Sequence, residues 1–251
     1  MSVVRKDLTV LIPVRNGMPR LKECIESVGC CEDILVILDD RSDDGTEDFL
    51  RKNSVPYFRQ KWLGFGPQQQ AGVDRVRTDW VMKLDSDEVI GEELNKEIMS
   101  LDLDQSDEVF SLKRKNHICE VWIRHGGWWP DRVRRIFNRR THHFDLAPVH
   151  EKIVGKNSQE SNLNEALHHY PYDSLEDFHK KIEHYGRLGA EKMKISKKKI
   201  FPWSGNVHGT WSFLATYVIR GAFLDGYWGL VVAWSAGAVT RRKYQLAYRK
   251  V

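Results

Sequence analysis

The feature that most constrains the fold is an alternation of short apolar runs with helix-like segments in the first 90 residues. The apolar runs lie at Leu8–Val14, Asp33–Asp40, Val55–Gln60 and Trp80–Leu84. Helical spacing or capping signals follow the first three runs, in 19–28, 42–52 and 71–78. Continuous apolar strands alternating with helices are typical of a parallel sheet covered on both faces. The sequence therefore predicts an α/β fold.

Polar residues follow three of these runs. Asn16 lies just after the first, the Asp39-Asp40 pair ends the second, and Asp85 and Asp87 follow the fourth. In parallel α/β sheets ligands bind beyond the carboxyl ends of the strands. We therefore expect these three loops to converge on one cleft.

The stretch "WVMKLDSDEVI", Trp80–Ile90, places carboxylates at the end of an apolar strand. Side chains of a strand alternate, so Asp85 and Asp87 point the same way and Glu88 points the other way. Two such carboxylates suit Mg²⁺ or Mn²⁺, which accept oxygen ligands and substrate phosphates. The alternative is a solvated strand end. Glu88 is expected to cap the next helix or to form an ion pair rather than to bind metal.

The order of short motifs carries a family resemblance. "IPVRN", "DDRSDDGT", "GFGPQQQ" and "LDSDE" occur in that order, and together they resemble the nucleotide-sugar-binding half of family 2 glycosyltransferases. Downstream, "GGWWPD", "PVHE", "LHHYPY" and "FLDGYWGL" resemble the bacterial branch that adds sugars to the lipopolysaccharide inner core. The resemblance implies a GT-A fold: a mostly parallel central sheet flanked by helices, with a C-terminal helical extension.

The resemblance also implies residue roles in donor binding. Pro13 and Asn16 would border the nucleotide, and Asp40 or Asp39 would accept a hydrogen bond from uracil. Asp85 would contact ribose or metal, and Asp87 would bind the metal that bridges the diphosphate. Gln68 and Ser86 are expected in the same donor site. Arg41, Asp43 and Gln70 depart from the family pattern, which usually has glycine, threonine and asparagine there.

Sugar transfer requires a stabilised leaving group and an activated acceptor hydroxyl. A divalent metal, Mn²⁺ or Mg²⁺, would neutralise the departing nucleoside diphosphate, and a general base would take the acceptor proton. The resemblance implies one-step displacement with inversion at the anomeric carbon. It also implies a hexose donor such as UDP-glucose and a lipid-linked saccharide acceptor.

Two carboxylates are candidates for the general base. Glu151 in "PVHEK" matches the family position better, and Asp131 in "GGWWPDR" would then position the acceptor or the sugar. The alternative for Glu151 is an ion pair with a nearby arginine. His150 is either a further metal ligand or a residue that orients Glu151.

The same region offers residues for the acceptor. Trp128 and Trp129 suit stacking on a sugar face, and equally suit anchoring a core. Arg132, with Arg134 and Arg135, could bind phosphate through bidentate contacts.

The chain divides by pattern into three regions. Residues 1–105 form the nucleotide-sugar-binding half, and residues 106–170, with more antiparallel strands, form the half that binds acceptor and carries the base. Residues 171–251 form a helical C-terminal region. The four cysteines form no CxxC pair and are expected to be reduced thiols.

Charge separates the C-terminal region from the rest. From Lys192 onward there are 11 Lys and Arg and one acidic residue, a net charge of +10, whereas the other 191 residues carry −6. Four of the nine tryptophans lie here, and the longest uncharged run, Gly226–Thr240, is 15 residues, short of the ~20 that span a bilayer. These features favour helices at an anionic membrane surface, or helices packed on the catalytic domain. We expect a cytoplasmic protein held peripherally at the inner membrane face, with no nucleic-acid partner.

Two other functions remain open. A polyprenyl-phosphate glycosyltransferase shares the donor half, and a degenerate transferase would be a non-catalytic nucleotide-sugar-binding scaffold. The presence of Asp85, Asp87 and Glu151 argues against the scaffold. The uncharged run Gly226–Thr240 is shorter than a membrane-spanning helix, which argues against the polyprenyl-phosphate enzyme.

Overall fold

The computed structural model describes residues 4–104, 107–146, 151–155, 159–195 and 200–248. The chain splits into two compact units. Unit 1 comprises residues 1–114 and 132–169, and unit 2 comprises residues 115–131 and 170–251. The division at residue 170 lies before the change in charge, which begins at Lys192. The loop carrying Trp128 and Trp129 belongs to unit 2.

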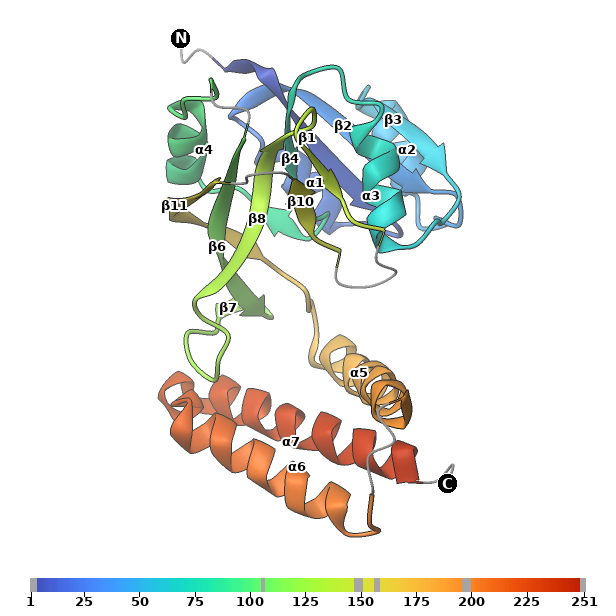
Figure 1. Ribbon diagram of the computed structural model, residues 1–251, viewed down its shortest axis with the longest axis vertical. Coiled ribbons are helices and arrows are strands. Elements are labelled where there is room, and N and C mark those ends of the chain that lie inside the picture. The colour runs from blue at the N-terminus through green and yellow to red at the C-terminus, as the bar shows by residue number, and fades with distance from the viewer. Residues whose placement is uncertain (1–3, 105–106, 147–150, 156–158, 196–199, 249–251) are drawn as a thin grey trace. The chain divides into compact units, whose positions relative to one another are not determined.

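The first half of the chain alternates strands and helices (Figure 1). Its elements are β1 Arg5–Val14, α1 Arg20–Glu26, β2 Cys31–Asp39, α2 Thr46–Lys52, β3 Tyr57–Gln60, α3 Phe65–Val73, β4 Trp80–Lys83, β5 Glu88–Val89 and α4 Glu92–Met99. The helix predicted at 71–78 instead begins earlier, at Phe65. Gly64 (φ 98°) turns the chain there, and Pro67 is tolerated in a first helical turn because its missing N–H is not needed.

The second half contains strands and then long helices. Its strands are β6 Glu108–Ile118, β7 Val121–Trp122, β8 Asp131–Asn138, β9 His142–Phe144, β10 Ile153–Gly155 and β11 Gln159–His169. Its helices are α5 Leu175–Ile195, α6 Ser204–Leu214, the π-helix η1 Ala215–Ile219, the 3₁₀ helix η2 Ala222–Asp225 and α7 Gly226–Tyr248.

Among the described residues, nine strands form one sheet with the order β3-β2-β1-β4-β8-β6-β11-β5, and β7 pairs with β6. The β3-β2-β1-β4 part is parallel, with Val14 opposite Leu38 and Leu11 opposite Lys83. β8 pairs with β4 in the antiparallel direction. The predicted α/β class, with a parallel N-terminal half and a helical C-terminal region, is confirmed.

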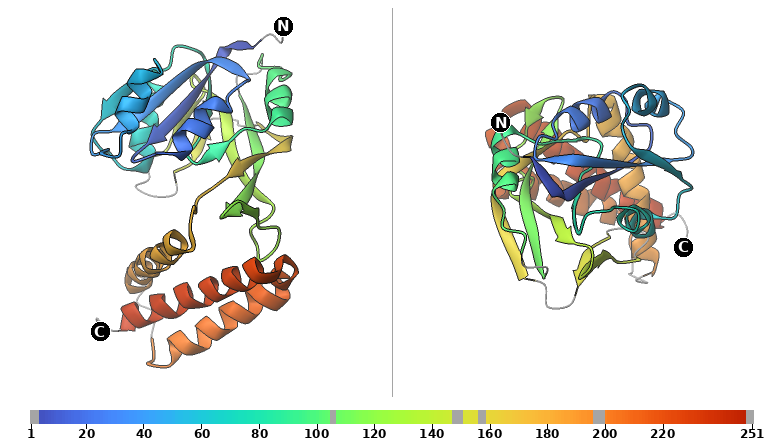
Figure 2. Two further views of the ribbon diagram at one scale, coloured as in Figure 1. Left: turned by 180° about the vertical axis from the view of Figure 1, so that it is seen from behind. Right: turned by 90° about the horizontal axis from the view of Figure 1, so that it is seen from above.

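Successive residues of β1 pack into two different hydrophobic clusters, one on each face of the sheet. Val10 and Ile12 pack in a cluster that includes Leu21 of α1 and Leu94 of α4, whereas Leu11 packs in a cluster that includes Val73 at the end of α3. Both faces of the parallel strands are therefore covered by helices (Figure 2). This arrangement leaves the carboxyl ends of β1, β2 and β4 as the edge where polar loops gather.

Unit 2 is built on the pair α6 and α7, which lie side by side (Figure 1). Gly209 and Gly237 allow the close approach: a Cβ at either one would lie 3.0 Å from the other's carbonyl oxygen. By length and composition, the segment Ala222–Tyr248 is long and apolar enough to cross a membrane, with 28% of its most apolar window buried. Core helices of water-soluble proteins meet the same test.

Candidate active site

The loops that follow β1 and β2 are bound to each other. Asn16 has a left-handed backbone (φ 51°), and its Nδ2 donates to Asp43 Oδ1 while its Oδ1 accepts from the Asp43 N–H, both at 2.9 Å. The Gly17 N–H donates to Thr46 Oγ1 at 3.1 Å, and the Met18 N–H donates to Asp44 Oδ2 at 2.9 Å. Asn16 therefore fixes the shape of this edge, and Asp43, where the family pattern has threonine, is its partner.

The two aspartates at the end of β2 differ in environment. Asp39 is 2% exposed, and it accepts from the Arg41 N–H (3.0 Å), Nε (2.9 Å) and Nη2 (2.6 Å). Hydrogen bonding from Arg41 lowers the pKa of Asp39. Asp40 is exposed. Arg41 therefore occupies the oxygens of Asp39, and Asp40 is the more accessible acceptor for a base.

Asp85 lies between two buried cations. Lys83 Nζ is 2.5 Å from Asp85 Oδ1, and Arg135 Nη2 donates to Asp85 Oδ2 at 2.7 Å. Burial alone would raise the pKa of Asp85, but these two cations hold it well below its ordinary value. The positive charge that the carboxylate cluster requires is thus supplied, at Asp85, by side chains of the chain itself.

Glu88 forms the ion pair expected of it. It is fully buried, its Oε1 contacts Arg135 and lies 3.4 Å from Arg114 Nη1, and its Oε2 accepts from the Asp85 N–H at 2.8 Å. Arg135 therefore joins Asp85 to Glu88 and fixes the turn that presents Asp87.

Asp87 is the more exposed member of the Asp85–Asp87 pair, with a side chain 36% exposed. His169, at the end of β11, places Nε2 3.6 Å from Asp87 Oδ1. Burial lowers the pKa of His169 to about 4, so its imidazole is neutral near pH 7 and has a lone pair for a metal. Within the described ranges, no group of three or more His, Cys, Asp or Glu could hold a metal ion. Asp87 and His169 supply two donors of the kinds that Mn²⁺ accepts, which leaves further positions for phosphate and water.

Glu151 is held by a residue of α3. Gln69 Nε2 donates to Glu151 Oε1 at 3.0 Å, while Gln69 is 4% exposed and its Oε1 accepts no hydrogen bond from the described part of the chain. The buried amide therefore fixes one oxygen of Glu151. The neighbouring Gln68, also buried, accepts from the Leu63 N–H at 3.3 Å. His150, predicted beside Glu151, lies outside the described residues.

The aromatic pair and Asp131 belong to unit 2. Trp128 packs in an apolar cluster that includes Ile123 and Phe178, and Trp129 meets Trp122 edge to face with ring centroids 5.3 Å apart. Asp131 Oδ2 accepts from Asn116 Nδ2 at 3.1 Å. Trp128 thus has the contacts of a core anchor, one of its two predicted roles.

The three arginines of β8 have different partners. Arg132 Nη1 donates to Asn162 Oδ1 at 2.8 Å, and Arg134 contacts Glu160 through Nε (3.0 Å) and Nη2 (2.7 Å). Arg135 is buried against Asp85 and Glu88. Arg132 and Arg134 are exposed, so these two remain accessible to an acceptor phosphate.

Sequence reasoning missed Lys83, Gln69 and His169 as parts of this site. Lys83 had a usable signal, since a lysine inside an otherwise apolar strand is expected to be buried only with a carboxylate partner. Gln69 could not be singled out within the run of three glutamines. His169 required the pairing of β11 with β5, where His169 lies opposite Glu88.

Comparisons with known proteins identify the family. The model of "Glycosyl transferase family 2" matches residues 9–157. An uncharacterised glycosyltransferase of Rickettsia prowazekii is 22% identical over 245 residues, covering 90% of this chain and 81% of that protein. One from Rickettsia bellii is 23% identical, with 92% and 82% covered.

Solved structures with a similar fold include TarS 1–349 of S. aureus in complex with UDP-GlcNAc, at 15% identity and a TM-score of 0.46, covering 97% of this chain and 92% of that one. GalNAc-T7 with UDP, GalNAc and Mn²⁺ has 12% identity and a TM-score of 0.47, covering 65% and 43%. The family model covers more than half of the sequence. The chain therefore belongs to glycosyl transferase family 2.

Proposed function

We propose that the protein is an inverting, metal-dependent glycosyltransferase that moves a hexose, glucose from UDP-glucose, onto a lipid-linked saccharide such as lipopolysaccharide core. The observation that carries the proposal is the convergence of three polar loops at the carboxyl edge of β1, β2 and β4. Asn16 binds the Asp43 loop, and Cys24 Sγ, on the helix that follows β1, donates to the Asp85 carbonyl at 3.4 Å. Family 2 membership supports the reaction class.

In this proposal Pro13, Asn16 and Asp40 border the nucleotide, with Gln68 and Ser86 in the same site. Asp87 and His169 would hold the metal. Asp85, held by Lys83 and Arg135, contacts ribose or completes the metal shell. When bound, the divalent ion would neutralise the diphosphate leaving group as a Lewis acid.

Glu151 is the proposed base because a buried amide positions its carboxylate. Fixing one oxygen through Gln69 leaves Oε2 to take the proton of the acceptor hydroxyl as that oxygen attacks the anomeric carbon. Asp131, Trp129 and Arg132 are assigned to the acceptor, with Asp131 as the alternative base, and Trp128 anchors the loop that carries Trp129 and Asp131.

The experiment is a transfer assay with a panel of nucleotide sugars, with Mn²⁺ or with EDTA. We expect UDP release from UDP-glucose to require Mn²⁺ and to fall at least a hundredfold in Asp87→Ala. NMR of the glycosylated product should show an anomeric configuration opposite to that of the donor. Full activity in EDTA would refute metal dependence, and full activity of Glu151→Gln would transfer the base role to Asp131.

The segment Ala222–Tyr248 favours one alternative, a polyprenyl-phosphate glycosyltransferase, because it is long and apolar enough to span a membrane. The acceptor separates the two functions. Transfer of the sugar to a polyprenyl phosphate, with no transfer to a lipid-linked saccharide, would replace the first proposal with the second.

A further inference from the structure

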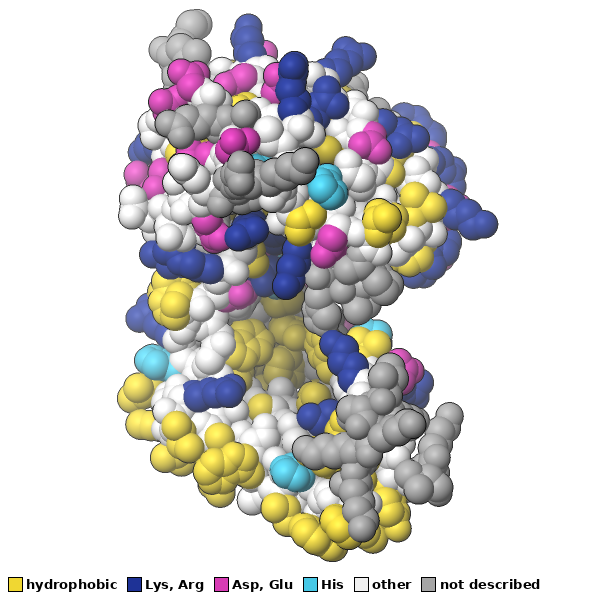
Figure 3. Space-filling model, in the orientation of Figure 1, with side chains coloured by type: hydrophobic (Ala, Val, Ile, Leu, Met, Phe, Trp, Pro, Cys, Tyr) yellow, Lys and Arg dark blue, Asp and Glu magenta, His cyan; other side chains and the backbone are white. Residues whose placement is uncertain are grey.

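The surface of α6 and η1 carries a continuous exposed apolar stripe. Its residues recur every three or four positions, so they lie along one face of the helix, and each is between 44% and 61% exposed. The stripe consists of Trp203, Val207, Trp211, Leu214 and Val218. Ile219 (70% exposed), Phe223 (49%) and Leu224 (62%) extend it around the turn into α7. Figure 3 shows hydrophobic side chains exposed at the surface over α6 and this turn.

The buried residues of α6 are small, and so are several of the buried residues of α7, which also include Val232 and Tyr244. α6 buries Ser204, Gly205 and Gly209, and the buried positions of α7 include Gly229, Ala233 and Gly237. A helix of a water-soluble protein normally buries its large apolar residues and exposes polar ones. α6 does the reverse, and small residues between helices with large apolar residues outside are the pattern of helices in contact with lipid.

The charges of this helix pair suit an anionic surface. Residues 200–248 contain four Lys and Arg and a single carboxylate, Asp225. Asp225 is turned inward: it accepts from the N–H groups of Arg124 (3.0 Å) and His125 (2.8 Å), and its side chain is 8% exposed. Arg220, at the turn, and Arg241, on α7, are exposed. This described stretch therefore has no exposed carboxylate that would repel phospholipid headgroups. Arg220 and Arg241 lie near the two ends of the stripe and can attract those headgroups.

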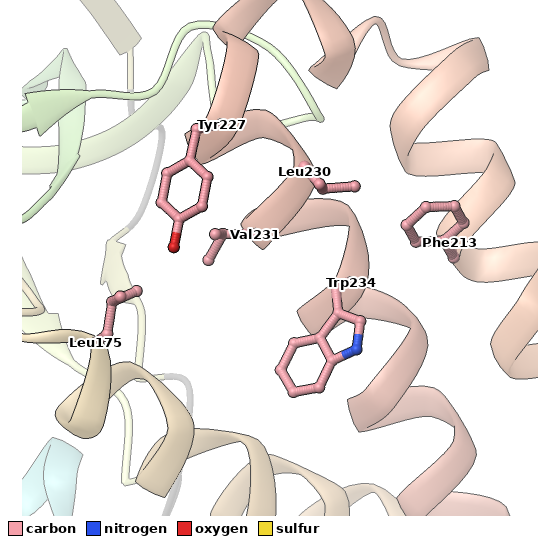
Figure 4. Close-up of a pocket in the computed structure, with 6 residues that line it drawn as sticks. All are labelled: Leu175, Phe213, Tyr227, Leu230, Val231 and Trp234. Carbon is pink, nitrogen blue, oxygen red and sulfur yellow. The ribbon is translucent and has the colours of Figure 1, made fainter.

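A second apolar feature lies between the helices of unit 2. Leu175 of α5, Phe213 of α6, and Tyr227, Leu230, Val231 and Trp234 of α7 line a pocket (Figure 4). These side chains carry no carboxylate or cation, so the pocket suits hydrocarbon rather than a sugar or a phosphate.

From the stripe, the inverted packing and the charges, we propose that the α6–η1–α7 helix pair docks in the plane of an anionic phospholipid surface. Trp203, Trp211 and the residues of the turn enter the boundary between headgroups and acyl chains, while Arg220 and Arg241 contact headgroup phosphates. A segment that lies in the interface does not cross the bilayer, so the 15-residue uncharged run Gly226–Thr240 is compatible with this surface, although Ala222–Tyr248 is also long and apolar enough to span a membrane. The proposal does not depend on the donor site.

The test is co-sedimentation of the purified full-length chain with vesicles. We expect binding to vesicles of 30% phosphatidylglycerol in phosphatidylcholine, and at least tenfold weaker binding to phosphatidylcholine alone. Trp203→Ser with Trp211→Ser should lower the partition coefficient at least tenfold. That factor is about 1.4 kcal/mol, less than the burial of two indole rings provides. Leu63→Ser, at an apolar residue of unit 1 that is 49% exposed, is the matched control and should bind like the wild type.

Other outcomes would overturn the proposal. Equal binding by the double variant and the Leu63 control would remove the stripe as the contact. A dimer in solution that the double variant dissociates would assign the stripe to a second copy of the chain, and resistance to extraction from membranes by alkaline carbonate would assign it to a spanning hairpin. Asp87→Ala should lose transfer activity and keep vesicle binding, so failure of the donor site and failure of the surface are distinguishable.

Discussion

Replacement of Arg135 by methionine tests whether the buried ion cluster holds the Asp85–Asp87 turn. Arg135 has a side chain 5% exposed and contacts Asp85 at 2.7 Å and the fully buried Glu88. Methionine fills a similar space without charge, which leaves two carboxylates close together. Removing one partner of a buried ion pair costs about 3 to 5 kcal/mol. Lys83 and Arg114 still face the carboxylates, so we expect the lower end, about 3 kcal/mol.

Urea unfolding measures this cost. With a slope of about 2 to 3 kcal/mol/M, the midpoint of the transition of unit 1 should fall by about 1 M or more. The matched control is Arg140→Met, because Arg140 forms a similar pair with Asp79 at 2.6 Å but is 72% exposed. An exposed pair contributes about 0 to 1 kcal/mol, so the control should shift little. If Arg135→Met lost less than about 1 kcal/mol, or no more than Arg140→Met, the cluster would not be what holds the turn.

Three further changes test other parts of the account. Hydrogen bonds from Arg242 and Arg187 lower the pKa of Glu183 to about 2, so its contribution to stability is full above the ordinary glutamate pKa near 4.5 and is lost as the pH falls toward 2. Glu183→Gln should therefore flatten the stability of unit 2 between pH 4.5 and 2, and an unchanged pH profile would contradict this. Gln69→Ala releases Glu151, so it should lower kcat by about tenfold, ~1.4 kcal/mol, with little change in the KM for the donor. An unchanged kcat would show that Gln69 does not position Glu151. Gly209→Leu should destabilise unit 2 by about 1 to 3 kcal/mol through overpacking against α7. Thr210→Leu, at an exposed position, should leave the stability unchanged. Equal thermal midpoints for the two variants would argue against the close contact between Gly209 and Gly237.

The parallel half of the fold could be predicted because its signals are local. The strands β1, β2 and β4 are continuous apolar runs, and polar residues follow each of them. These strand ends also indicate which edge of the sheet carries Asn16, Asp40 and Asp87. The predicted helix at 71–78 is wrong in its bounds, since α3 spans Phe65–Val73. Glycine and proline disfavour a helix interior, but Pro67 is compatible with a first helical turn.

Contacts distant in sequence could not be predicted from local pattern. Arg135 reaches Asp85 across 50 positions, Glu151 meets Gln69 across 82, and His169 reaches Asp87 through the pairing of β11 with β5. Each contact depends on strand order in the antiparallel half, where "RVRR" presents several equivalent arginines. The sequence indicated the types of residue in the site, and the tertiary contacts select among them.

The most direct test of the central claim is calorimetric titration of the protein with UDP in the presence of Mn²⁺. We predict binding by the wild type that EDTA abolishes. The Asp87→Ala variant should lose this binding, whereas Asp48→Ala, at a carboxylate 83% exposed on α2, should keep it. Equal UDP affinity in Asp87→Ala and wild type, with or without Mn²⁺, would contradict a metal-dependent donor site at the carboxyl edge of β4.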